Sequence, residues 1–320
     1  MKVNNINNYV GEVDLFIFSS GFERRSTKLG ESLNDLQLKQ SYVFHLDETY
    51  KISYENIIIV KKNIPKTEIV VYPKNNPLET FSIYNGIISK FIENNFKNDK
   101  LKVVIDITTF TREVMLILIK VLSNKSVSRK LNVLLVYTPA KSYSESKESL
   151  WLTKGVRDIR SVVGYSGLHS PSKKLLLIVL TGFEEERTER IIESFEPFKL
   201  ILGKPSQKHS INSELNIISN QKFDLIKDKF KRILLEEFEF SCQNIGNTKD
   251  IISQIHNKYR NEYNIVISPL NNKVSTIAVG IAGLENQDIQ ICYASANQYN
   301  IDTPHEACNY FLCFNLSRLL

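Results

Sequence analysis

Short apolar runs alternate with longer amphipathic, charged stretches along this chain of 320 residues. Apolar runs bounded by turn residues indicate buried strands, and longer amphipathic stretches indicate helices. The predicted strands cover residues 15–19, 41–46, 56–61, 69–72, 101–107, 132–137, 175–180, 198–202, 265–268 and 289–293. The predicted helices cover residues 23–36, 77–94, 111–122, 222–238, 248–260, 274–284 and 303–320. Because strand and helix alternate, the pattern predicts parallel sheets with helices on both faces.

Three short motifs occur twice in the chain, in the same order. They are [Ser/Thr]-Gly-Phe-Glu at 20–23 and 181–184, a strand end at Asp106 and Ser268, and Tyr-x5-Tyr over 137–143 and 293–299. Gly21 and Gly182 of the first motif lie 161 residues apart (182 − 21). Asp106 and Ser268 of the second lie 162 apart (268 − 106). Three motifs in the same order, at offsets of 156 to 162 residues, indicate a tandem duplication.

The duplication predicts an α/β protein of two tandem Rossmann-like units with parallel sheets, related by a pseudo-twofold axis. The first unit is expected to cover residues 1–143, and the second residues 173–320 with a C-terminal helix. The connector, residues 144–172, is too rich in apolar residues for a flexible linker, so we expect it to pack. A ligand cleft is expected between the two units.

The composition is that of an ordinary globular protein, with 42% hydrophobic residues and a net charge of +6. The charge is mild and spread along the chain, so it is compatible with an anionic partner but indicates no nucleic-acid-binding arm. The four cysteines lack the spacing of a disulfide framework, which indicates reduced thiols. Without a signal-type N-terminus or a membrane-length apolar run, we expect a cytoplasmic protein that makes no membrane contact.

The candidate ligand-binding residues follow the carboxyl ends of predicted strands, where open α/β sheets bind their ligands. In the first copy they are Gly21, Asp106, Thr108, Thr109, Thr111, Arg112 and Tyr137. In the second copy they are Gly182, Asn271, Asn272, Lys273 and Tyr293. The glycines would permit close backbone approach, the cations would pair with phosphate, and the tyrosines would stack on a base. No P-loop, dinucleotide fingerprint or hydrolase motif occurs, and neither a cofactor nor a metal is predicted.

Each of these assignments has a plainer alternative. Each glycine could serve only to turn a strand into a helix, and each tyrosine could end or cover a core strand. Glu23 and Glu184 could form an acid/base pair, but a solvated helix face is the favoured interpretation for them and for the neighbouring arginines. The carboxylate of Asp106 is replaced in the second copy by Ser268, so the two sites are expected to differ in chemistry.

The segment Asp106-Ile-Thr-Thr-Phe-Thr-Arg112 resembles a turn of the CRISPR-associated Rossmann-fold (CARF) sensor domains. In that family a strand ends in an Asp-x-Thr-Gly-Gly-Thr-Lys-like turn that opens a helix and contacts a cyclic oligonucleotide. Asp106, Thr108 and Thr111 match, Arg112 replaces the usual Lys, and the two glycines are absent. A tandem pair in one chain is similar to the SAVED sensors. The resemblance implies a nucleotide second-messenger sensor of antiviral defence that acts through a protein effector.

The sequence is compatible with three functions. The leading one is a sensor that binds a nucleotide or cyclic oligonucleotide. The second is a ring-nuclease-like phosphodiesterase or nucleotide hydrolase on the same scaffold, so catalysis is undecided. The third is a scaffold subunit of a defence complex. The oligomeric state, monomer or homodimer, is also left open.

Overall fold

The computed structural model describes residues 1–46, 51–142, 152–301 and 306–320 of the chain. It divides into two compact units. Unit 1 comprises Met1–Glu145 together with Ile301–Leu320, and unit 2 comprises Ser146–Asn300. Within its described residues, each unit is a largely parallel sheet covered by helices, so the predicted α/β class is confirmed.

Unit 1 is built on a seven-stranded sheet in the order β1-β15-β6-β5-β2-β3-β4. Its strands are β1 (Lys2–Val3), β2 (Val13–Ser19), β3 (Leu38–Leu46), β4 (Glu68–Tyr72), β5 (Leu101–Asp106), β6 (Leu131–Tyr137) and β15 (Phe311–Asn315). The five strands from β6 to β4 are parallel, and β15 is antiparallel to β6. Counted along the chain, the parallel strands have the order 3-2-1-4-5 that is typical of Rossmann-like folds.

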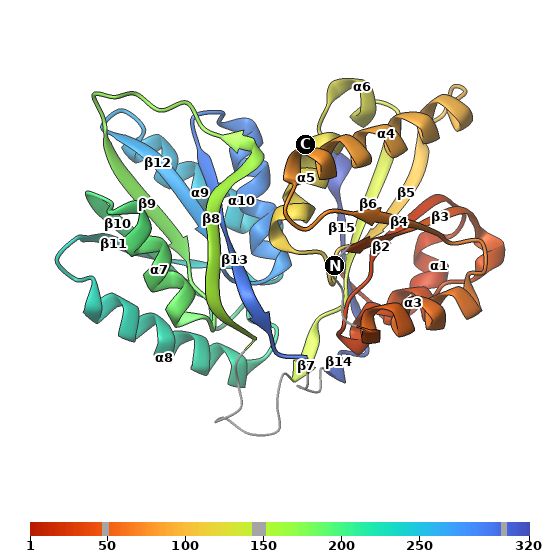
Figure 1. Ribbon diagram of the computed structural model, residues 1–320, viewed down its shortest axis with the longest axis horizontal. Helices are drawn as coiled ribbons and strands as arrows, with labels where there is room; N and C mark the ends of the chain where they lie inside the picture. Colours follow the sequence, from red (N-terminus) through yellow and green to blue (C-terminus); the bar gives the residue numbers. More distant parts are fainter. Residues whose placement is uncertain (47–50, 143–151, 302–305) are drawn as a thin grey trace. The chain divides into compact units, whose positions relative to one another are not determined.

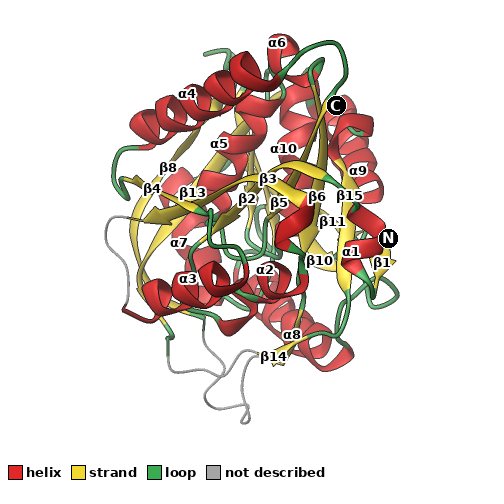
Figure 2. Cartoon of the chain, turned by 90° about the vertical axis from the view of Figure 1, so that its right-hand side faces the viewer, coloured by secondary structure: helices red, strands yellow, loops and turns green. Residues whose placement is uncertain are grey.

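Helices cover both faces of this sheet (Figure 2). One face packs against α1 (Ile6–Val10), α2 (Lys28–Ser32) and α3 (Lys51–Asn63), which share a buried apolar cluster with the strands. The other face carries α4 (Pro77–Asn95) and α5 (Arg112–Leu122), and the short α6 (Lys125–Ser128) follows α5. Tyr84 of α4 packs its ring against Phe44 of β3 at 4.4 Å. Asn76 caps α4 by accepting from the backbone of Glu79, and Pro77 occupies a first-turn position that suits its missing N–H.

Unit 2 is built on a six-stranded sheet in the order β11-β10-β9-β12-β13-β8 (Figure 1). Its strands are β8 (Thr153–Ser166), β9 (Lys174–Leu180), β10 (Lys199–Pro205), β11 (Leu234–Phe240), β12 (Tyr263–Pro269) and β13 (Gln290–Tyr299). The first five in the sheet are parallel and again have the order 3-2-1-4-5, while β8 is antiparallel to β13. The same strand order in both units agrees with the duplication in the sequence.

The helices of unit 2 also lie on both sides of its sheet (Figure 1). On one side are α7 (Glu185–Phe195) and α8 (Ser213–Lys229), whose residues Ile191 and Phe223 belong to a buried cluster with the strands. On the other side are α9 (Ile245–Tyr259) and α10 (Lys273–Glu285). Among the described residues, no helix combines the length and apolar character needed to cross a membrane.

Two predicted elements of unit 1 are wrong. The β-branched run at 56–61 belongs to helix α3, because Ile57, Val60 and Ile64 at helical spacing all pack into the core. The helix predicted at 23–36 is replaced by two short 3-10 helices around α2.

Two further predictions fail in the second half. The helix predicted at 222–238 ends as α8 at Lys229, and the following alternating segment forms strand β11. The C-terminal helix predicted at 303–320 is absent from its described part, which forms β14 (Glu306–Ala307), β15 and a 3-10 helix. An apolar run as short as 311–315 is compatible with either a buried strand or a helix. Here the run forms a strand, because it pairs with β6.

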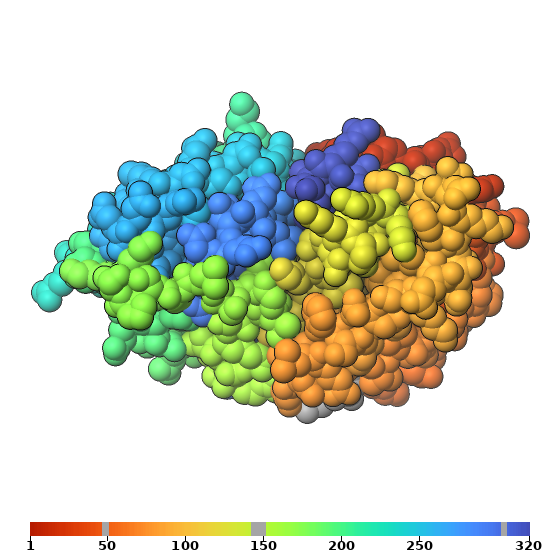
Figure 3. Space-filling view, turned by 90° about the horizontal axis from the view of Figure 1, so that it is seen from above, coloured from red at the N-terminus to blue at the C-terminus, as the bar shows by residue number. Residues whose placement is uncertain are grey.

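The domain boundaries also differ from the expected ones. Residues 301–320 belong to unit 1, where β15 pairs with β6 and β1 pairs with β15. Figure 3 shows these C-terminal residues in dark blue against residues of the first unit. A two-stranded sheet of β14 and β7 (Ala140–Ser142) belongs to the same unit. The expected connector contributes β8 to the sheet of unit 2, so it packs as an element rather than as a link.

Candidate functional site

The candidate residues of each unit gather where the strand order reverses. This point lies between β2 and β5 in unit 1 and between β9 and β12 in unit 2. Gly21 follows β2 and Gly182 follows β9, while Asp106–Arg112 and Asn271–Lys273 follow or end β5 and β12. Loops at such a reversal form the usual ligand-binding crevice of open α/β sheets.

The two glycines allow the loop after the first parallel strand to pack against the loop after the fourth. A Cβ on Gly21 would lie 2.6 Å from the Cβ of Thr109, and a Cβ on Gly182 would lie 2.7 Å from the carbonyl oxygen of Leu270. The carbonyl of Gly21 accepts a hydrogen bond of 2.7 Å from Asn56. The close approach is therefore made to the protein itself, and approach to a ligand remains a prediction.

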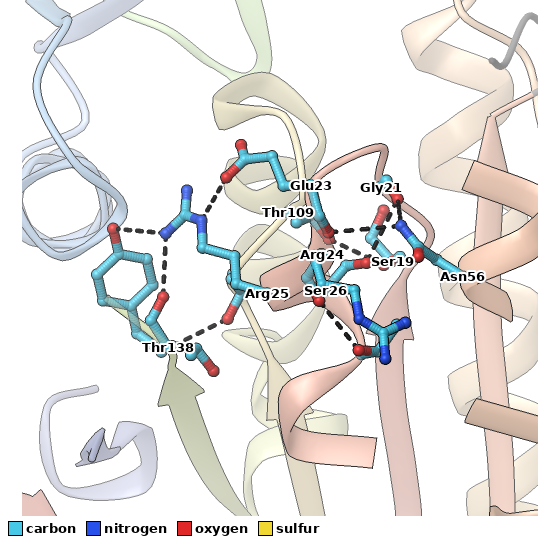
Figure 4. Close-up of polar contacts among 12 residues, drawn as sticks. Ser19, Gly21, Glu23, Arg24, Arg25, Ser26, Asn56, Thr109 and Thr138 are labelled. Carbon is cyan, nitrogen blue, oxygen red and sulfur yellow. Dashed lines mark hydrogen bonds and ion pairs between the residues drawn. The ribbon is translucent and has the colours of Figure 1, made fainter. Parts of the chain in front are cut away.

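The turn after β5 is held by its own hydroxyl groups. Asp106 is buried and accepts hydrogen bonds from the backbone N–H of Thr108, at 2.9 Å, and from the Thr108 hydroxyl. That hydroxyl accepts in turn from the backbone N–H of Thr138, at 2.9 Å, beyond the end of β6. Thr109 donates to the carbonyl of Ser19 at the end of β2, at 2.9 Å (Figure 4). The turn thus joins the carboxyl ends of three neighbouring strands.

Burial raises the pKa of Asp106 from its ordinary 3.8 to about 6. The two hydrogen bonds from Thr108 and the positive charge of Arg25 act in the opposite direction, but burial outweighs them. Asp106 therefore gains its negative charge near neutral pH, well inside the protein.

In unit 2, two asparagines join the strand ends in place of the threonines. Asn271 donates to the carbonyl of Thr181 at 2.8 Å, and its side-chain oxygen accepts from the thiol of Cys242 at 3.3 Å. Asn272 donates to the carbonyl of Cys242 at 2.8 Å. These contacts link the ends of β9, β11 and β12, and Ser268 stands buried at the position of Asp106.

A cation begins the helix after the fourth parallel strand in both units. Thr111 caps α5 by accepting from Val114 at 3.3 Å, and Arg112 is the first residue of that helix. Asn272 caps α10 by accepting from the backbone N–H of Ser275 at 3.0 Å, and Lys273 is the first residue of that helix. Arg112 and Lys273 are both half-buried and lie 161 residues apart (273 − 112).

A buried arginine spans the strand ends of unit 1. Arg25 is only 5% exposed, and its Nε donates to the carboxylate of Glu23. Its Nη1 donates to the hydroxyl of Tyr137 at 3.3 Å and to the carbonyl of Thr138 at 3.0 Å. Figure 4 shows Arg25 between Glu23 and Thr138. The side chain thus connects the loop after β2 to the end of β6.

Unit 2 repeats this arrangement. Arg187 is 4% exposed and donates from Nη1 to Glu184 at 2.7 Å. Glu184 also accepts from the hydroxyl of Thr153. The guanidinium carbon of Arg187 lies 5.7 Å from the ring centre of Tyr293. The guanidinium carbon of Arg25 lies at the same distance from the ring centre of Tyr137. We call these two sets, Glu23–Arg25–Tyr137 and Glu184–Arg187–Tyr293, the Glu–Arg–Tyr trios.

The burial and contacts of the trio residues differ from the roles expected for them from the sequence. Tyr137 and Tyr293 are 2% and 7% exposed and contact arginines, so as placed they are core strand residues rather than open stacking surfaces. The interpretation of the glutamates and arginines as a solvated helix face is wrong for Arg25 and Arg187, which are buried. The sequence does contain a signal for these two arginines, because a Glu and then an Arg follow Gly-Phe in both copies. The second tyrosine of the first Tyr-x5-Tyr motif, Tyr143, lies outside the described residues.

A groove of about 680 Å³ lies between β8 and α7 of unit 2. Its lining carries charges of both signs and consists of Gly155, Val156, Arg157, Asp158, Ile159, Glu186, Arg190, Glu193, Ser194 and Asn297. None of the candidate residues from the sequence lines it.

Metal and thiol chemistry find no support in the described part of the chain. No group of three or more His, Cys, Asp or Glu side chains there could hold a metal ion. Burial raises the pKa of Cys242, Cys292 and Cys313 to about 12, so these thiols stay protonated at neutral pH.

Comparison with known proteins gives no family, since no family model and no curated protein matches the chain. Among solved structures, it is similar to a protein of Pseudomonas aeruginosa described as a universal stress protein, with a TM-score of 0.26 and 7% identity over 88% of this chain and 92% of that one. It is also similar to UDP-GlcNAc 2-epimerase from Neisseria meningitidis, with a TM-score of 0.22 and 11% identity over 80% of this chain and 76% of that one. At such TM-scores neither likeness carries an argument about this chain.

Proposed function

We propose that the protein is a regulatory sensor that binds a nucleotide or cyclic oligonucleotide at the carboxyl edges of its sheets. The observation that carries the proposal is the recurrent cation at the start of α5 and α10. Each follows the fourth parallel strand, beside the point where the strand order reverses. A phosphate group there would meet both a cation and the positive end of a helix dipole.

The electrostatics of the helix start support an anionic ligand. Arg112 and Lys273 each lie at the positive end of a helix dipole, where a cation is disfavoured by roughly 0.3–1 kcal/mol. Neither cation improves the helix it begins, and yet both copies have one. An anion bound at either helix start would offset the positive charge of the cation there.

The resemblance of Asp106–Arg112 to the CARF turn extends the proposal to cyclic oligonucleotides and antiviral defence. In this account a separate protein effector delivers the response. The hydrogen bonds among Asp106, Thr108 and Thr138 would keep the turn rigid, so that ligand binding need not order it.

Thermal-shift measurements with cyclic di-, tri- and tetranucleotides, and with ATP as a linear control, test the proposal. We expect at least one of these compounds to raise the Tm of the wild type. The Arg112→Ala/Lys273→Ala double variant should keep the unliganded Tm, because Ala suits a helix start at least as well, and should lose the shift. Charge-assisted contacts to phosphate contribute about 1.5–3 kcal/mol each, so affinity should fall by well over tenfold. An unchanged shift in the double variant would refute the proposed site.

The geometry does not favour the hydrolase alternative. Glu23 and Glu184, the carboxylates that could form an acid/base pair, are each bound to the arginine of their own trio. Asp106 is buried against Thr108. Chromatographic assay of the same nucleotides after prolonged incubation with concentrated protein checks this. We expect no turnover, and consumption that depends on Asp106 would establish the hydrolase instead.

A further inference from the structure

The outer edge of β4 differs from the other sheet edges of the protein. In the part of the chain that the structure describes, the two larger sheets end in edge strands, which are β1 and β4 in unit 1 and β11 and β8 in unit 2. An edge strand exposes a row of unpaired N–H and C=O groups, and proteins usually protect it by shortness, charge or bulges.

Three of the four edges carry such protection. β1 has only two residues. β11 carries three glutamates, of which Glu237 pairs with Lys227 at 2.7 Å. β8 carries lysine and arginine, two irregularities in its register with β13, and Gly155 and Gly164 with positive φ. Each of these edges therefore discourages the addition of another strand.

β4 lacks these devices. Its sequence is Glu-Ile-Val-Val-Tyr, with one charge at the amino end and then only β-branched or aromatic residues. Val71 is 54% exposed and Ile69 is 39% exposed, on the face that Val43 and His45 of β3 share with them. Among the described residues, β4 pairs with β3 alone.

Apolar side chains extend this edge beyond the strand. The ring of Tyr54 on α3 lies 6.1 Å from that of His45, which pairs directly with Val71. Leu78, 67% exposed, lies in the first turn of α4, the helix that follows β4 in the chain. The side chains of a strand added to the sheet at β4 would cover these apolar side chains.

The charges at the two ends of β4 complement each other across a twofold axis. Glu68 begins the strand, and Lys74 lies two residues beyond its end. If two copies of β4 pair antiparallel with Val71 opposite Val71, Glu68 of each copy stands opposite Lys74 of the other (68 + 74 = 2 × 71). Lys66, which precedes the strand, pairs with Asp35 of its own chain at 3.4 Å. The pattern is therefore self-complementary, as a twofold interface requires.

We propose that β4 is a dimerisation edge, at which two copies of this chain pair their β4 strands antiparallel. The interface joins the seven-stranded sheets of the two copies through main-chain hydrogen bonds, and places Val71 opposite Val71 of the partner and Ile69 opposite the partner's Pro73 (69 + 73 = 2 × 71). It does not depend on the ligand or on the residues of the proposed nucleotide site.

Sedimentation velocity and light scattering at micromolar concentration, under reducing conditions, test this proposal. We expect the wild type to have twice the chain mass of 36.9 kDa. Val71→Lys should halve the measured mass, because it adds a charge to an exposed position of the edge. The control is Leu235→Lys, the same kind of change on the exposed face of the β11 edge, which should leave the dimer intact. A monomeric wild type, or a dimer that survives Val71→Lys, would overturn the proposal.

Cross-linking provides a second readout that does not depend on a disruptive substitution. Val71→Cys should form a disulfide-linked dimer under mild oxidation, because directly opposed residues of antiparallel strands lie within disulfide reach. Leu235→Cys should not. Absence of the cross-link in a dimeric Val71→Cys protein would rule out this register.

Discussion

At the residue scale, the candidate site is a set of side chains that hold one another in place. Thr108, Thr109 and Asn271 were expected to contact a ligand, and in the structure they join strand ends by hydrogen bonds of 2.8–2.9 Å. Their place at the ends of strands could be predicted from the sequence, because they follow apolar runs. Their hydrogen-bond partners could not be predicted, because contacts across 30 to 90 positions depend on which strands become neighbours.

The raised pKa of Asp106 predicts a specific pH dependence of stability. Because the folded pKa of about 6 exceeds the ordinary 3.8, the folded state retains the proton longer than the unfolded state. The contribution of this group to stability is fully present below pH ~4 and is lost as the pH rises through ~6, by about 3 kcal/mol in total. Asp106→Asn can still accept from the Thr108 N–H but does not titrate. Relative to this variant, the wild type should therefore become less stable as the pH rises.

Urea unfolding of both proteins at a series of pH values from 4 to 8 measures this difference. A constant difference, or one that changes in favour of the wild type as the pH rises, would show that Thr108 and Arg25 lower the pKa of Asp106 at least as much as burial raises it.

Gly182 should tolerate no side chain, because its Cβ position lies 2.7 Å from a backbone oxygen. We expect Gly182→Ala to lower the free energy of unfolding by about 1–3 kcal/mol. Gly86→Ala is the matched control, since Gly86 lies in α4 with no atom near its Cβ position. That change should be neutral or stabilise by up to about 1 kcal/mol. Equal effects of the two substitutions in thermal denaturation would contradict the packing role of Gly182.

At the element scale, the clearest predictions from the sequence concerned strands that end in polar turns. The strands around Ile17, Ile105 and Ile178 follow directly from apolar runs that are buried on both faces. Segment 56–61 was assigned to the wrong class because its β-branched residues favour a strand, whereas packing of Ile57 and Val60 against the sheet selects a helix. The apolar segment 311–315 could not be assigned because its partner, β6, lies far away in the sequence.

The Glu–Arg–Tyr trios connect elements, and we expect each to be needed for the stability of its own unit. Arg187→Met would leave the carboxylate of Glu184 buried without its cation, which should cost about 3–5 kcal/mol. Adding Glu184→Gln to this variant should restore part of the loss, because the buried charge is removed. Arg190→Met is the control on the same helix, where the side chain is exposed and its ion pair at 3.7 Å contributes little. Chemical denaturation checks all three variants, and a loss no larger for Arg187→Met than for Arg190→Met would contradict this account.

At the scale of the whole molecule, three short motifs in the sequence predicted the duplication. The strand order 3-2-1-4-5 in both units agrees with it. The boundaries could not be predicted, because each unit adds an antiparallel strand from a different part of the chain next to its fifth parallel strand. Unit 1 takes β15 from the C-terminus, and unit 2 takes β8 from the expected connector. The parts that recur, namely glycine, trio and helix-start cation, lie at the carboxyl edge of each sheet. This shared edge is the reason for placing the function there.

The proposed function requires that the carboxyl edge of each sheet bind a nucleotide through its own helix-start cation, Arg112 in unit 1 and Lys273 in unit 2. Equilibrium titration of the wild type and of the Arg112→Ala/Lys273→Ala variant, with the cyclic nucleotide that gives the largest thermal shift, tests it most directly. We expect saturable binding to the wild type and loss of that binding in a variant that melts at the same temperature. Equal affinity in the two proteins, or no binding of any cyclic nucleotide to the wild type, would contradict the claim.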